Sequence, residues 1–305
     1  MKVTEFSEKT KRDHIPAPWE SELGKDDFVS YMPSYRGGAY LDLFSEIHTP
    51  QETVGEMTSY LYDPVENGAD AEKSYPLIVF LHGATNALAG KICVMHSGCE
   101  LYASPKYQAE LGGAFLLVPL ANEKRDENGE LIDSWSESYL EPLYKIIMEI
   151  KQNHNISKII VTGGSSGGVM SWMMAETYTD LVDVCMPISS GYTPNEETLL
   201  RLDASGMQIL VGHGRHDELC AFAESVAPKE KVLAELKNCH CYFPDWVRNG
   251  DHGVASLNFG FEMGQHCLIN QVQANLMFDD GTPYDAALPN GLTAWIREAV
   301  SKSRG

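Results

Sequence analysis

Three long apolar runs constrain the fold of this 305-residue chain more than any other feature of its sequence. They are "YPLIVFLHG" (75–83), "GAFLLVPLA" (113–121) and "KIIVTGG" (158–164). A continuous apolar run of this length is typical of a strand that is buried on both faces. The stretches between the runs are long enough for helical crossovers, which connect parallel strands. We therefore predict an α/β fold in which a mostly parallel central sheet carries helices on both faces.

The alternation of strand and helix continues along the chain, and no repeat or low-complexity linker divides it. Ligands of open parallel sheets bind beyond the carboxyl ends of the strands. Three of the expected strands run into "LHGAT", "GGSSGG" and "GHGRHDEL", so we expect the functional site at this edge. Further strands are expected at 56–64, 181–190, 207–214 and 239–244, and helices at 136–155, 167–178, 224–238 and 290–300.

The charge balance limits the classes of partner. With 23 Lys and Arg against 43 Asp and Glu, the net charge of −20 disfavours nucleic acid and anionic membrane surfaces. No stretch approaches 18 apolar residues, and the amino terminus lacks the apolar core of a signal peptide. We therefore expect a cytoplasmic protein, with secretion as the alternative if a signal peptide has been removed. The sequence is compatible with a homo-oligomer but does not indicate one.

The cysteines do not predict a disulfide framework or a metal site. Seven cysteines, an odd number in a chain of this length, are typical of reduced thiols. The segment "CHC" places Cys239 and Cys241 on one face of a strand and His240 on the other. The three side chains cannot share one ion, so we interpret them as packed thiols and an unrelated histidine.

The segment "GGSSGG" (163–168) follows an apolar run and precedes a helix-like pattern. A phosphate loop would carry a lysine after the glycines, and none follows here. The spacing of the glycines does not give the G-x-G-x-x-G of a dinucleotide site either. The remaining alternative is the G-x-S-x-G elbow, a strained turn that presents a serine nucleophile.

The elbow fits in two frames, one centred on Ser165 and the other on Ser166. Residues two positions from the nucleophile must be almost free of side chain, because strand and helix approach each other there. We favour Ser165, since its frame begins closest to the last apolar residue of the strand, Val161, and leaves Gly168 for close packing of the helix.

With this elbow the chain resembles the α/β-hydrolase superfamily, and within it the polyhydroxyalkanoate-depolymerase-like, feruloyl-esterase-like and predicted-peptidase branch. The resemblance rests on "IIVTGGSSGGVM", "PLIVFLHGAT" and "FLLVPLANE…DSW". It implies an α/β-hydrolase fold over residues 51–305, in which 246–289 form an inserted hairpin and loop region before the last helix. Residues 1–50 would be an N-terminal extension that serves as an arm or a cover.

A serine hydroxyl needs a histidine base, and the base needs a carboxylate to fix its tautomer. In this superfamily the order along the chain is serine, acid, histidine. The acid expected after the strand 207–214 is Asp217, with Glu218 as its rival. Two histidines compete for the role of base. His252 follows the hairpin signal Asn249-Gly250, and we favour His266 over it because the returning arm would bring His266 back to the sheet.

The resemblance also assigns the rest of the site. The backbone N–H groups of Ala84 and Ser166 would form the oxyanion hole, whereas His82 would hold a loop by hydrogen bonding. Four aromatic residues are candidates for an acyl or aryl pocket, although a residue of this kind is more often part of the core: Trp135, Trp246, Tyr102 and Phe259. No metal and no cofactor is implied.

The activity implied is that of a serine carboxylic ester hydrolase on a small-molecule substrate. Two other functions stay open at this point. One is a serine peptidase or amidase on the same fold, and the other is a catalytically silent hydrolase scaffold that acts as a binding module.

Overall fold

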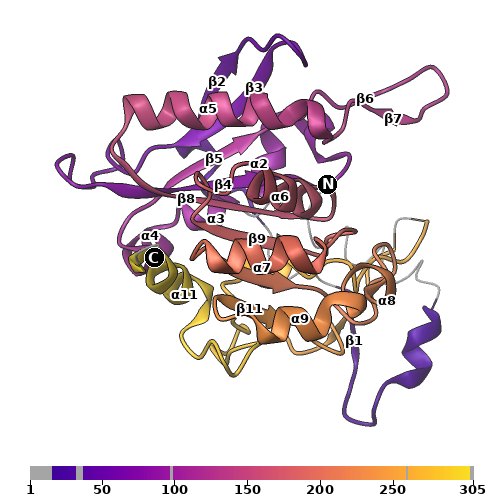
Figure 1. Cartoon of the computed structure of the whole chain (residues 1–305). Coiled ribbons are helices and arrows are strands. Elements are labelled where there is room, and N and C mark those ends of the chain that lie inside the picture. Colours follow the sequence, from indigo (N-terminus) through magenta and orange to yellow (C-terminus); the bar gives the residue numbers. More distant parts are fainter. Residues whose placement is uncertain (1–15, 32–36, 97–98, 259, 303–305) are drawn as a thin grey trace.

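The computed structural model describes residues 16–31, 37–96, 99–258 and 260–302. Within these ranges the central element is an eight-stranded sheet of order β11-β10-β9-β8-β4-β5-β3-β2 (Figure 1). The strands from β11 to β5 are parallel, and β3 and β2 continue the sheet in antiparallel pairing. The strands are β2 Ser45–Thr49, β3 Met57–Tyr62, β4 Tyr75–Leu81, β5 Phe115–Pro119, β8 Ile156–Gly164, β9 Val184–Ile188, β10 Gln208–Gly212 and β11 Cys239–Tyr242.

Helices cover both faces of the sheet, so the predicted α/β architecture is confirmed. Successive residues of β4 are buried in opposite apolar clusters, with Leu77 and Val79 on one face and Ile78 and Phe80 on the other. The first cluster is completed by α5 Leu140–Asn153, α6 Ser166–Thr177, α7 Glu196–Ala204 and α9 Glu230–Glu235. The second is completed by α2 Cys93–His96, α3 Cys99–Tyr102, α4 Pro105–Leu111, α10 Ile269–Gln273 and α11 Gly291–Ser301.

The strand order contains a point at which the chain changes direction across the sheet. From β4 the chain moves to β5 on one side, and it returns to β8 on the other side of β4. In open α/β sheets, ligands bind at the carboxyl ends of the strands where the strand order reverses in this way. This is the position in which the sheet places "LHGAT" and "GGSSGG".

Helix α7 was not predicted from the sequence, although its start carries a signal. Asn195 caps the helix by accepting a hydrogen bond from the Thr198 N–H at 2.9 Å, and two glutamates fill the first turn. The helix expected over 224–238 is divided into α8 Phe222–Ser225, a 3-10 turn Ala227–Lys229 and α9. Pro228 lacks an N–H donor, and the α-helix is interrupted there.

The expected N-terminal extension and the expected inserted region 246–289 contact each other. Strand β1, Val29–Ser30, pairs in parallel with β12, Val254–Ala255, in a small separate sheet. The expected hairpin at Asn249-Gly250 is a tight turn, since the Asn249 N–H donates to Gly253 O at 2.9 Å. A single antiparallel bridge joins its arms, from Arg248 to Val254.

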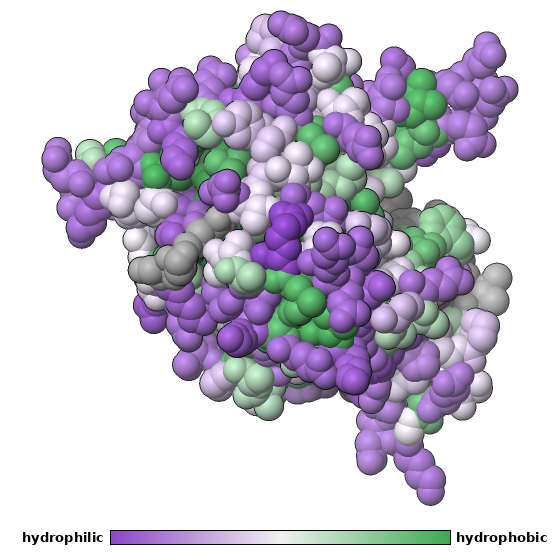
Figure 2. All heavy atoms as spheres, viewed as in Figure 1, coloured by the Kyte–Doolittle hydropathy of each residue, from purple (hydrophilic) through white to green (hydrophobic). Residues whose placement is uncertain are grey.

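The outer surface agrees with the acidic composition. Hydrophilic residues cover most of the face in view, and small hydrophobic areas interrupt them (Figure 2). A two-stranded ribbon of β6 Lys124–Arg125 and β7 Leu131–Ile132 projects from the body after β5 (Figure 1). Among the described residues, no helix combines the length and the apolar character that a membrane span requires.

Candidate active site

Ser165 lies at a sharp bend between β8 and α6. Its backbone has φ 59° and ψ −122°, a conformation that is costly for a residue with a side chain. The bend is held in place because the Ser165 N–H donates to Ile188 O on the neighbouring strand at 2.9 Å. Ser165 is partly exposed, so its hydroxyl is not sealed within the core. This is the geometry of a nucleophile elbow.

The glycines on either side of Ser165 are required because the ends of the neighbouring strands β4 and β9 lie too close to leave room for a side chain. A Cβ on Gly163 would lie 2.2 Å from Leu81 O, and one on Gly167 would lie 1.9 Å from the same oxygen. A Cβ on Gly168 would lie 2.8 Å from Ile188 O. The end of β4 therefore passes directly against the strand and the helix that flank Ser165.

We expect Gly167→Ala to destabilise the fold by about 3 kcal/mol, because the added methyl would overlap the Leu81 carbonyl and the backbone would have to shift. Gly191→Ala is the matched control. The nearest atom to its new Cβ is Cys220 Sγ at 3.4 Å, and we expect a change below about 1 kcal/mol. Urea unfolding of the two variants checks this, and equal midpoints would contradict the steric argument.

The loop after β4 lies beside the same bend. A Cβ placed on Gly83 would be 3.7 Å from Ser165 Cβ, so Ala84 follows a residue in contact with the elbow. Ser166 is the first residue of α6, where backbone N–H groups have no partner within the helix. Its own hydroxyl is buried and makes no hydrogen bond within the described part of the chain.

His266 and Asp217 form a buried pair. The His266 Nδ1–H donates to both carboxylate oxygens of Asp217, at 2.8 and 2.9 Å. The N–H groups of Leu219 and Cys220 also donate to Asp217 Oδ1, at 2.9 and 2.7 Å. The carboxylate can only accept, so the proton of a neutral His266 ring lies on Nδ1, and Nε2 can act as an acceptor.

The chain that follows His266 returns to the elbow. Only Cys267 and Leu268 separate the histidine from helix α10, and Ile269 is the first residue of that helix. A Cβ on Gly164 would lie 3.3 Å from the Ile269 side chain. The residue before Ser165 is therefore in contact with a residue three positions after His266.

Comparison with known proteins supports the fold. No protein-family model matches the sequence, and no curated protein matches it. Among solved structures, a thermostable esterase matches over 77% of this chain with 22% identity and a TM-score of 0.59, and this chain spans 61% of that esterase's length. The chain has the α/β-hydrolase fold.

Two further structures match the same hydrolase fold. A protein named FAE matches over 83% of this chain and 94% of its own, with 14% identity and a TM-score of 0.52. A feruloyl esterase module from Clostridium thermocellum, complexed with sinapinate, matches over 73% of this chain and 88% of its own, with 14% identity and a TM-score of 0.50.

Within this hydrolase fold the two candidate histidines have different surroundings. His252 is about half exposed, stacks on Phe278 at 3.8 Å between ring centroids, and bonds to Asp280 at 3.0 Å. His266 is buried and bonds to Asp217. The rival carboxylate, Glu218, accepts from the backbone N–H of His266 at 2.9 Å and not from its ring.

His82 has a structural role in the loop after β4. Its Nδ1–H donates to Gly83 O at 2.8 Å, and its Nε2 accepts from the Ala121 N–H at 3.0 Å. Burial lowers the pKa of this imidazole, in agreement with a neutral ring that links two strand ends. The indole of Trp135 donates to His82 O at 2.9 Å and packs against the same ring.

The other aromatic candidates differ in position. Trp246 is half-buried and stacks on His216, one residue before Asp217, at 3.8 Å between centroids. Tyr102 is fully buried and donates to Val272 O at 3.0 Å, so it belongs to the core and does not line a pocket. Phe259 lies outside the described residues.

His213 is a residue whose contact with the site the sequence analysis did not predict. It lies four residues before Asp217, in the segment "GHGRHDEL" that follows β10. Its Nε2–H donates to Cys220 O at 2.7 Å, and the same nitrogen is 3.5 Å from Asp217 Oδ2. Burial lowers the pKa of His213, which favours a neutral ring behind the carboxylate.

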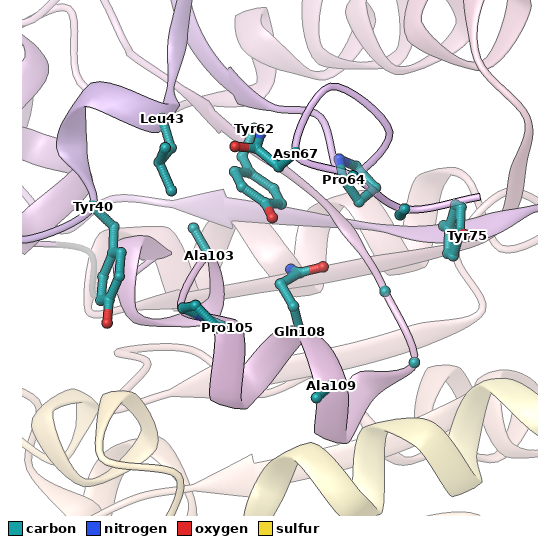
Figure 3. Close-up of a pocket in the computed structure, with 14 residues that line it drawn as sticks. Tyr40, Leu43, Tyr62, Pro64, Asn67, Tyr75, Ala103, Pro105, Gln108 and Ala109 are labelled. Atoms are coloured by element: carbon teal, nitrogen blue, oxygen red, sulfur yellow. The ribbon is translucent and has the colours of Figure 1, made fainter. Parts of the chain in front are cut away.

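A pocket of about 460 Å³ lies elsewhere on the molecule (Figure 3). It is lined by Tyr62 at the end of the antiparallel strand β3 and by Tyr75 at the amino end of β4. Ser165 follows the carboxyl end of β8, whereas this pocket lies at the amino ends of the parallel strands. Within the ranges described, no group of three or more His, Cys, Asp or Glu could hold a metal ion.

Proposed function

We propose that the protein is a serine hydrolase that cleaves carboxylic esters through an acyl-enzyme. Ser165 is the nucleophile, His266 is the general base and Asp217 is the carboxylate that orients it. The observation that carries the proposal is the buried His266–Asp217 pair, with bonds of 2.8 and 2.9 Å, on a loop whose following helix contacts the strained Ser165 bend.

The residues would act in two half-reactions. Ser165 Oγ attacks the ester carbonyl carbon while its proton passes to His266 Nε2, and the imidazolium is stabilised by Asp217. The N–H groups of Ala84 and Ser166 would stabilise the oxyanion of the tetrahedral intermediate. The C–O bond to the alcohol then breaks, and His266 returns the proton to the leaving oxygen. Water repeats the sequence on the acyl-enzyme, which releases the acid and restores Ser165.

An ester is favoured over an amide for two reasons. An alcohol leaves more readily than an amine, and the matching structures above 0.5 in TM-score include one described as a thermostable esterase. Exposed Leu88 and Leu219 in the loops after β4 and β10, together with half-buried Trp135 and Trp246, would suit an apolar or aromatic acyl group.

The test is active-site labelling combined with a substrate panel. We expect a fluorophosphonate to form an adduct on Ser165 of the folded protein, and we expect a short-chain aryl ester or a feruloyl ester to be hydrolysed faster than a peptide anilide. Anilide turnover without ester turnover would assign an amidase. The absence of an adduct on Ser165 in folded protein would indicate a catalytically silent hydrolase scaffold.

A further inference from the structure

The N-terminal segment 16–31 is packed against the part of the chain that leads to His266. Beyond the β1–β12 pairing, the Val254 N–H donates to Phe28 O at 2.7 Å, and Asp27 forms an ion pair with Arg248. Trp19 and Ala17 share a small apolar cluster with Val254. The segment is therefore attached along its length to the turn that precedes the histidine.

Trp19 in this segment contacts the loop after β10, which carries Asp217 and Glu218. Its side chain is buried, at 6% exposure, and its ring packs against Trp246 with 5.4 Å between centroids. Its indole Nε1–H donates to Glu218 Oε1 at 3.1 Å. The bond joins residues that are 199 positions apart in the sequence.

Glu218 also binds the backbone of the histidine, so it connects Trp19 to His266. Its Oε2 accepts from the His266 N–H at 2.9 Å, and its Oε1 also accepts from the Gln265 N–H at 3.2 Å. Burial raises the pKa of Glu218, while the hydrogen bonds from the Gln265 N–H and the Trp19 indole oppose the increase. A buried carboxylate is retained at low cost only when such donors compensate it.

His266 is thus held at two points by consecutive residues of one loop. Asp217 binds its ring, and Glu218 binds its backbone. The ring bond alone leaves the imidazole free to move with its backbone, whereas the second bond fixes the backbone as well. Catalytic groups must be held within a fraction of an ångström, because small displacements of a reacting group slow the reaction severalfold or more.

We propose that Trp19 and Glu218 are positioning residues, through which the N-terminal segment sets the place of the His266 imidazole beside Ser165. The proposal rests on the function proposed above. It makes residues 16–31 a component of the catalytic apparatus and gives Glu218 a role distinct from that of Asp217.

The first test is Trp19→Phe, which removes the N–H donor and keeps most of the apolar packing. We expect kcat on a turned-over ester to fall about fivefold with KM within about twofold, because the change removes the hydrogen bond that leads to the base and keeps an aromatic ring against Trp246. Ser21→Ala is the matched control. Ser21 belongs to the same 3-10 helix, Pro18–Glu22, is exposed, and donates to Pro18 O within its own helix, so we expect the kcat of this variant to equal that of wild type.

The second test is a double-mutant cycle with Glu218→Gln. The amide nitrogen of the new side chain cannot accept a hydrogen bond. The bridge from Trp19 through residue 218 to the His266 N–H is therefore lost on one side, and we expect kcat to fall about tenfold or more. Glu224→Gln, an exposed glutamate on α8, is the control. If Trp19 acts through Glu218, Trp19→Phe adds little to Glu218→Gln. Fully additive losses would overturn the proposal, since they would indicate two independent structural effects.

Hydrogen exchange separates this inference from the proposed function. We expect the peptide that contains Gln265 and His266 to exchange faster in Glu218→Gln, and to a smaller extent in Trp19→Phe, than in wild type or Ser21→Ala. Unchanged exchange in both variants would overturn the bridge whether or not the protein hydrolyses esters. If the wild type is active, and the two variants exchange faster but keep the wild-type kcat, the positioning role is overturned. A wild type without Ser165 labelling would refute the proposed function alone.

Discussion

Ser165→Ala is expected to lower kcat on any turned-over ester by about three orders of magnitude or more, because no other hydroxyl is presented by the strained bend. The substitution removes a single oxygen from a partly exposed side chain, so the fold should be unaffected. The measurements are steady-state kinetics and fluorophosphonate labelling, and the label should be lost together with the activity.

Ser166→Ala is the matched control for this result. The Ser166 hydroxyl is buried and has no hydrogen-bond partner among the described residues, and its proposed contribution is the backbone N–H, which alanine retains. We expect Ser166→Ala to keep activity within about tenfold of wild type. If Ser166→Ala were inactive and Ser165→Ala active, the second frame of the elbow would be the correct one.

His266→Ala is expected to have a comparable effect, with a loss of about three orders of magnitude in kcat. The imidazole is the only acceptor proposed for the Ser165 proton, and its removal leaves Asp217 without its ring donor. His252→Ala should lose less than about threefold, because His252 is about half exposed and bonds to Asp280. Steady-state kinetics of the two variants, with circular dichroism as a check of folding, makes the comparison.

The contrary result is equally clear. A large loss in His252→Ala with near-normal activity in folded His266→Ala would transfer the role of base to the hairpin turn. In that case the His266–Asp217 pair would be a structural element, and the inference about Trp19 and Glu218 would lose its catalytic meaning.

The sequence could predict seven of the eight strands of the sheet, all except the edge strand β2, because those strands are marked locally. All seven residues of β4 are buried, and such a strand carries apolar residues without alternation. The elbow was equally visible, since close approach of backbone excludes every residue but glycine at positions such as 163 and 167. Helix α7 was missed although Asn195 provides a cap, because a short polar helix has weak periodicity.

The choice between His252 and His266 could not be made from sequence in the same way. Both follow the last strand of the sheet. What distinguishes them is the contact with Asp217, which lies 49 positions before His266. A tight turn at 249–253 and the return of the chain decide which ring reaches that carboxylate. Those are properties of packing between segments, and no local pattern encodes them.

By itself the sequence determined the α/β class, the serine at the bend and the acidic loop after β10, since each depends on a few neighbouring residues and on the intrinsic geometry of their backbone. Only the tertiary structure decided that His266 pairs with Asp217 and that Trp19 reaches Glu218. Contacts over 49 and 199 positions depend on how loops fold back over the sheet, and that is fixed by the burial and hydrogen bonding of the whole chain.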